Sequence, residues 1–143
     1  MTHFSMAIAA LALAATLQAQ VSKLPTGTQA LQGTWQITSL NGQPMPAEGP
    51  GMTLTFSGEK YHQAVGGKVN ERGTIKLDAS KKPMTIDLLI AEGDDAGKIQ
   101  LGIIEVTGDE VRASLDTPNA KQRPTDFKPK DGVITFVGKR QKS

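Results

Sequence analysis

The sequence contains no cysteine, and this absence excludes several kinds of protein. Disulfide-stapled folds, thiolate zinc sites and cysteine nucleophiles all require a thiol group. The chain also lacks a Gly-x-Ser-x-Gly nucleophile motif, a phosphate-binding loop and a dinucleotide fingerprint. We therefore expect no cofactor and no metal site. A domain without disulfides depends on its hydrophobic core, and 143 residues can supply one for a single domain.

An excess of charge of one sign is also missing. The sixteen Lys and Arg residues and fourteen Asp and Glu residues leave a formal net charge of +2. A surface of mixed sign offers no extended basic patch for a polyanion. We therefore expect no nucleic-acid partner.

Residues 1–19 carry no Lys, Arg, Asp or Glu. Residues 4–17 are rich in Ala and Leu, and Leu17-Gln18-Ala19 ends in the small residue that signal peptidases accept. The run is shorter than the roughly 20 residues that cross a bilayer, so we expect no membrane span. These features predict a signal peptide over 1–19 and a secreted or periplasmic protein. A buried N-terminal helix is the alternative, because no basic residue precedes the apolar run.

Long stretches without Gly or Pro are absent beyond residue 20. The longest windows between successive Gly or Pro residues enclose nine residues, at 74–82, 84–92 and 109–117. A mean α-helix is about 11–12 residues long, and Gly and Pro destabilise its interior by roughly 1 and 3 kcal/mol. The spacing therefore predicts an all-β domain, which we place at 32–143 after an extension at 20–31.

Short segments rich in β-branched residues lie between these breaks. Tight turns such as Asn41-Gly42, Gly66-Gly67 and Gly108-Asp109 separate many of them, and turns this short join antiparallel strands. The pattern predicts an eight-stranded antiparallel up-and-down barrel, because closure removes exposed sheet edges. A two-sheet sandwich is the alternative. The eight expected strands are 33–40, 52–57, 60–66, 69–77, 84–91, 98–106, 110–116 and 133–140.

Alternating apolar residues predict which face of each strand points inward. In the segment 98–106 we expect Ile99, Leu101 and Ile103 to face the interior and Gln100 to face solvent. Leu89 and Ile104 break the alternation and are expected on the outer face. The other residues expected inside are Leu54, Phe56, Ile86, Leu88, Ile90, Val111, Ala113 and Leu115.

Large aromatic side chains are scarce, with five beyond residue 20. An eight-stranded barrel either fills with side chains or holds one small ligand, and few large side chains leave room for a ligand. The first hypothesis is therefore an exported barrel that binds a small apolar molecule at its open end. The expected wall residues are Met52, Leu54, Tyr61, Leu88, Leu101 and Leu115.

Residues able to support catalysis are few. His62 has no second histidine near it beyond residue 20 and is expected on the surface, and the acidic run 92–95 has the spacing of a turn rather than of a calcium loop. Glu105 shares its face with Leu101 and Ile103 and is a candidate inward carboxyl group near a barrel end. Because no acid–base pair can be assembled, we do not expect an enzyme.

The long connector 117–132 contains three prolines and belongs to a basic C-terminal region. From residue 121 to 143 there are seven basic residues and two acidic ones. Phe127 is exposed unless it folds back over the barrel as a lid. The second hypothesis is a monomeric interaction module with a filled barrel, which binds a protein or envelope partner through Leu89, Ile104 and this basic segment.

Gly33-Thr34-Trp35 resembles the Gly-x-Trp signature on the first strand of lipocalins and related calycins. The resemblance implies that Trp35 closes one end of the barrel and that Arg140, at the end of the last strand, packs across its ring. The blocks LQGTWQ (31–36), MTLTF (52–56), KPMTIDL (82–88) and RPTDF (123–127) are similar to a family of uncharacterised lipocalin-like domains abundant in planctomycete bacteria. That family implies a fold and no established activity.

Overall fold

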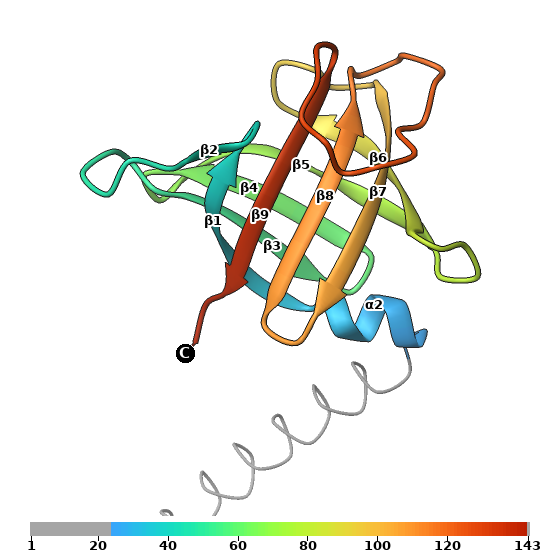
Figure 1. Cartoon of the computed structure of the whole chain (residues 1–143), viewed down its shortest axis with the longest axis horizontal. Helices are drawn as coiled ribbons and strands as arrows, with labels where there is room; N and C mark the ends of the chain where they lie inside the picture. The colour runs from blue at the N-terminus through green and yellow to red at the C-terminus, as the bar shows by residue number, and fades with distance from the viewer. Residues whose placement is uncertain (1–23, 143) are drawn as a thin grey trace, which may run out of the picture.

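The computed structural model describes residues 24–142, which form one short helix and nine strands (Figure 1). The expected signal peptide lies outside the described residues. Among the residues described, no helix has the length and apolar character needed to cross a bilayer. The elements are α2 (Thr26–Leu31), β1 (Gly33–Leu40), β2 (Gln43–Pro44), β3 (Met52–Ser57), β4 (Lys60–Val65), β5 (Lys68–Asp78), β6 (Met84–Glu92), β7 (Ile99–Thr107), β8 (Glu110–Asp116) and β9 (Val133–Arg140).

The strands form a closed, antiparallel, up-and-down β-barrel, so the fold expected from the sequence is confirmed. Each strand from β3 to β9 pairs with the next, and β1 pairs with β3 on one side and with β9 on the other. The two-residue strand β2 pairs only with the end of β1 and is not one of the eight strands that close the barrel. The strand bounds agree with the expected ones within one residue.

The turns adopt the backbone conformations that their residues favour. Asn41 and Gly42 have φ of 52° and 80°, and Gly66 and Gly67 have φ of 60° and 81°. Two successive positive φ angles match the twist of the flanking strands, and Asn and Gly accept them at low cost. These local preferences explain why the strand boundaries could be predicted.

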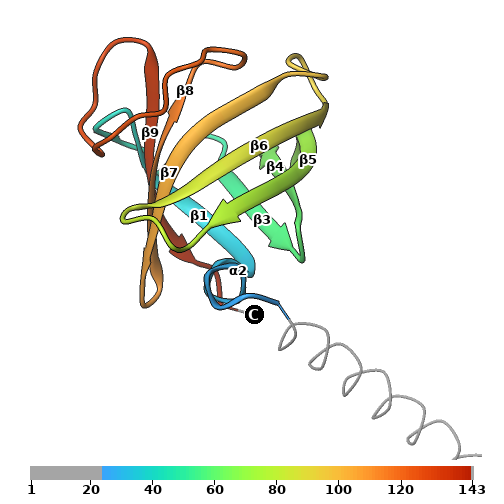
Figure 2. The same ribbon diagram turned by 90° about the vertical axis from the view of Figure 1, so that its right-hand side faces the viewer.

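The helix α2 lies across one end of the barrel (Figure 2). The side chain of Trp35 is fully buried beside it and closes this end. The indole Nε1 donates a hydrogen bond to the Leu31 carbonyl at 2.8 Å, and the Arg140 guanidinium lies 4.3 Å from the indole centroid. Arg140 also donates to the carbonyls of Ala30 and Gln32. The expected Trp–Arg contact is present, and the hydrogen bonds of Arg140 also link α2 to the last strand, β9.

The backbone conformation favours glycine at residue 33. Its φ of +108° is unfavourable for residues that carry a Cβ. Space does not add to this preference, because a Cβ would lie 3.5 Å from Nη1 of Arg140, an ordinary van der Waals contact.

The predicted facing of β7 is wrong. Ile104 belongs to the buried core and Gln100 lines the interior, whereas Leu101 lies opposite Asp87 on the outer face. Ile99 is 47 % exposed, and Ile103 is buried although it points outward. β7 is apolar on both faces, so alternation alone could not decide which face is inside.

Burial of outward residues on β7, β8 and β9 results from the connector 117–132, which folds over the outside of the barrel (Figure 1). Arg123 donates to the carbonyls of Ile86 and Gly102 at 3.0 and 2.9 Å, and it forms an ion pair with Asp87 at 2.7 Å. Phe127 stacks on Arg112, with 4.1 Å between Cζ and the ring centroid. Phe127 therefore packs against the outer wall and is not a lid over the mouth.

Candidate functional site

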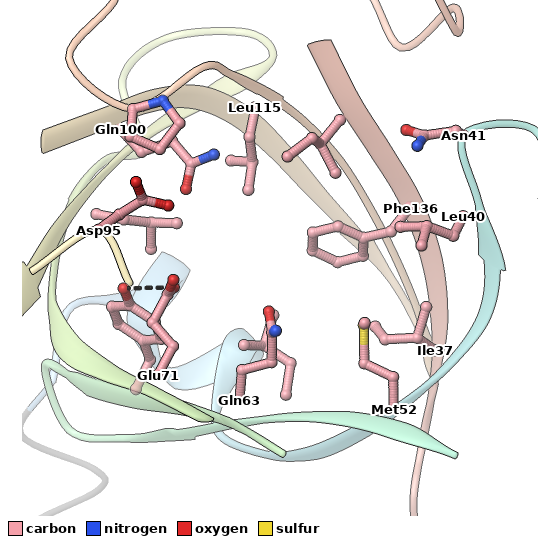
Figure 3. Close-up of a pocket in the computed structure, with 15 residues that line it drawn as sticks. Ile37, Leu40, Asn41, Met52, Gln63, Glu71, Asp95, Gln100, Leu115 and Phe136 are labelled. Carbon is pink, nitrogen blue, oxygen red and sulfur yellow. Dashed lines mark hydrogen bonds between the residues drawn. The ribbon is translucent and has the colours of Figure 1, made fainter. Parts of the chain in front are cut away.

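A cavity of about 310 Å³ occupies the open half of the barrel (Figure 3). The closed half is filled by side chains such as Trp35, Phe56 and Ile86, which are almost completely buried. The volume falls at the small end of the range of about 300–1,000 Å³ that is usual for small-molecule sites. The interior is therefore divided into a packed core and a ligand-sized space.

Most of the cavity wall is apolar. Five of the six wall residues expected from the sequence line it, and Leu101 is the exception because it faces outward. The five are Met52, Leu54, Tyr61, Leu88 and Leu115. Apolar side chains that were not singled out complete this wall, namely Ile37, Leu40, Pro118, Ile134 and Phe136.

A polar wall faces this apolar surface, and its first component is the pair Tyr61–Glu71. The Tyr61 hydroxyl donates a hydrogen bond to Oε2 of Glu71 at 3.0 Å. Gly73 provides the space for the tyrosine ring, because a Cβ there would lie 2.8 Å from Cε1 of Tyr61 and 2.2 Å from the Leu89 carbonyl oxygen. The absence of a side chain at residue 73 thus lets the ring lie across β5 and reach the carboxylate.

Two further polar side chains, Gln100 and Asp95, lie on the same side of the cavity as Glu71 in Figure 3. Gln100 is 5 % exposed, and its Nε2 donates to the Asp116 carbonyl at 2.9 Å. Asp95 comes from the turn between β6 and β7 and forms an ion pair with Lys98 at 3.0 Å. This side of the cavity is therefore rich in hydrogen-bond acceptors.

Burial and neighbouring charge change the proton affinity of the Tyr61–Glu71 pair. Desolvation raises the pKa of Glu71, the hydrogen bond from Tyr61 opposes that rise, and the charge of Asp95 adds to it. The pKa of Tyr61 is raised by burial and further by the carboxylate of Glu71. No Lys, Arg or His side chain within 24–142 forms an ion pair with Glu71.

This polar wall was not among the features expected from the sequence. Around Glu71 the segment KVNERG has no apolar alternation, and two β-bulges change the facing of the strands at this level. For Gln100 a signal was present. The two-residue turn Gly108-Asp109 makes Val106 the partner of Val111, and directly paired residues share a face. Counting back from Val106 places Ile104, Gly102 and Gln100 inside.

The other residues considered for chemistry lie outside the cavity. Glu105 faces outward, contrary to expectation, and pairs with Arg112 at 3.1 Å. His62 lies between Thr55 and Arg72 of the neighbouring strands, on the outer side. Across the described part of the chain, no three His, Asp or Glu side chains are placed to hold a metal ion.

Comparison with known proteins gives no family assignment. Neither a protein-family model nor a curated protein sequence matches this chain. The cavity is therefore the feature that bears on function.

Proposed function

We propose that this protein is an exported, lipocalin-like binding protein that holds one small, largely apolar molecule in the open end of its barrel. The observation that carries the proposal is the cavity of about 310 Å³, whose wall is mostly apolar with a few polar groups. Glu71, Asp95 and Gln100 lie on one side of it, and Asn41 and Gln63 lie elsewhere on the wall (Figure 3). Small-molecule sites commonly combine an apolar lining with a few polar groups. The interior of an eight-stranded barrel either fills with side chains or holds one small ligand, and here the open half is not filled.

Export is part of this proposal, and the sequence of residues 1–19 supports it. N-terminal sequencing of the protein recovered from its native host should find Gln20 as the first residue. A chain that retains Met1 and stays in the cytoplasm would contradict export and leave the binding proposal intact.

A matched pair of variants tests binding. Leu115→Trp places a bulky side chain in the cavity, whereas Leu101→Trp makes the same change on the outer face. In calorimetric titrations with 1-octanol, we expect Leu115→Trp to weaken binding at least tenfold and Leu101→Trp to change it less than twofold. Failure of the wild-type protein to bind octanol or a similar short amphiphile would contradict the proposal, as would equal losses in both variants.

Binding of a protein or envelope partner is the alternative, and one observation favours it. Leu89 and Ile99 face each other across β6 and β7 on the outer surface, with 42 % and 47 % of their area exposed. Ile104, the other residue expected there, is in the core. One exposed pair is a weak basis for an interface, since interaction patches usually extend over several hundred Å².

A further inference from the structure

We propose that the cavity selects amphiphiles with a cationic, hydrogen-bond-donating head group, such as a primary alkylammonium. The head group lies against Glu71 and Gln100, and the apolar body lies against the opposite wall. This inference rests on the proposed function and adds the chemical class of the ligand.

One hydrogen-bond acceptor on the cavity wall has no protein donor. Gln100 is 95 % buried, and the hydrogen bond from its Nε2 to the Asp116 carbonyl fixes the orientation of the amide. Its Oε1 has no hydrogen-bond partner within residues 24–142 and is open to the cavity, into which it points in Figure 3. The oxygen is therefore available to a ligand that donates a hydrogen bond, and a ligand that covers it without donating one would incur the cost of an unsatisfied acceptor.

The charge of the cavity wall also favours a cationic head group. Glu71 and Asp95 each bring a carboxylate, while Lys98 pairs only with Asp95. One negative charge therefore has no cationic partner. None of the side chains that line the cavity belongs to Lys, Arg or His, so a ligand carboxylate would meet repulsion and no counterion.

Electrostatics inside a partly closed cavity strengthen this preference. Coulomb interactions are stronger there than in bulk water because the effective dielectric constant is lower, and charge-assisted hydrogen bonds are about twice as strong as neutral ones. Burial raises the pKa of Glu71 and the charge of Asp95 raises it further, so the carboxylate is poorly compensated where it stands. An ammonium group beside Glu71 would supply that cation.

Three ligands that share one alkyl chain test the head group. 1-Octylamine is protonated at neutral pH, as a lysine side chain is, 1-octanol is uncharged, and octanoate is negative. In calorimetric titrations of the full-length mature protein at pH 7 and low salt, we expect octylamine to bind about tenfold more tightly than octanol. Octanoate should bind more weakly than both.

The variant Glu71→Gln tests whether Glu71 causes the preference for octylamine. It keeps the size of the side chain and an acceptor for Tyr61 and removes the charge. We expect it to abolish the preference for octylamine and to change octanol affinity less than twofold. Glu59→Gln makes the same charge change at an exposed residue in the turn between β3 and β4 and should keep the preference.

The outcomes separate this inference from the proposed function. Equal binding of octylamine and octanol, tighter binding of octanoate, or an unchanged preference in Glu71→Gln would overturn the head-group inference and leave a binding cavity. Failure of all three ligands to bind would overturn both proposals. If Glu71→Gln does not fold, Asp95→Asn serves as the second variant, and a preference reduced at least twofold is expected.

Discussion

Trp35 and Arg140 offer the first test at the scale of single residues. Trp35 has no exposed surface, so Trp35→Ala creates a cavity and should lower the free energy of unfolding by roughly 3–5 kcal/mol. Arg140→Ala should cost less, since it removes a stacked guanidinium and its bonds to Ala30 and Gln32. Because the two side chains touch, a double-mutant cycle from urea melts should show coupling of about 0.5 kcal/mol or more. Additive effects with a silent Arg140→Ala would contradict the closing role of the pair.

Glu71 gives the second residue-scale prediction, which concerns stability and pH. Its pKa is raised in the folded state, so the folded protein binds this proton more tightly than the unfolded chain does. The associated stability is present below the pKa of the unfolded chain, near 4.3, and is lost as pH rises through the folded value.

We therefore expect Glu71→Gln to be at least as stable as wild type at pH 7, with the difference shrinking toward pH 4. Burial is the main cause of the raised pKa of Glu71, the hydrogen bond from the neutral Tyr61 hydroxyl opposes it, and the charge of Asp95 adds to it. Thermal melts at pH 4, 5.5 and 7 measure the difference. A variant that is less stable than wild type at pH 7 would show that Glu71 serves the fold rather than the cavity.

At the scale of elements, the prediction concerns the contribution of Arg123 to stability. Arg123 holds the connector 117–132 against β6 and β7 through hydrogen bonds and an ion pair. Its guanidinium donates to the carbonyls of Ile86 and Gly102 and to the carboxylate of Asp87, and the Arg123 side chain is 30 % exposed. Arg123→Ala should destabilise the protein by about 1.5–3 kcal/mol, the usual range for hydrogen bonds to charged groups. Hydrogen exchange in 117–132 should become faster.

Arg72→Ala is the matched control, since its ion pair with Glu92 is largely exposed and such pairs contribute little. A loss below about 0.5 kcal/mol is expected for that variant. Equal losses in the free energy of unfolding for the two substitutions would mean that Arg123 does not hold the connector against the barrel.

Prediction from the sequence succeeded for the elements and failed for the facing of one of them. Strand boundaries depend on local turn chemistry at residues such as Asn41, Gly42 and Gly66, and local chemistry is visible in a sequence. Alternation does not show the facing of β7, because the distant connector 117–132 covers apolar residues on its outer face. The pairing of Val106 with Val111 across the turn Gly108-Asp109 does show it. Alternation alone placed Leu101 inside and Ile104 outside, the reverse of the structure.

The candidate site was predictable to the extent that it is apolar. Alternating apolar residues identify Leu54, Leu88 and Leu115 as wall residues. Glu71 could not be found in this way, because bulges at Asn70 and Ala91 shift the facing of the strands without any compositional signal. The residues that would set ligand specificity are thus the ones that periodicity does not show.

At the scale of the whole molecule, a ligand in the cavity should stabilise the folded barrel. Binding to the folded state alone adds about 2.7 kcal/mol at a ligand concentration one hundred times Kd, which raises Tm by several degrees. We expect this rise with octylamine for the wild type and for Leu101→Trp, and little or none for Leu115→Trp. Calorimetric scans at several ligand concentrations measure it. A Tm that stays constant at saturating octylamine would show that no ligand occupies the cavity.

The position of the two described ends has a practical consequence for orientation. The C-terminal strand ends beside α2, at the closed end, and Arg140 bonds to carbonyls just after and within that helix (Figure 2). The mouth, with Ile134 and Pro118, lies at the opposite end. A fusion partner, affinity tag or solid support attached at either described end therefore lies on the side of the barrel away from the opening. Protein immobilised on a sensor chip through one end should present an unobstructed mouth to the solution that flows over it.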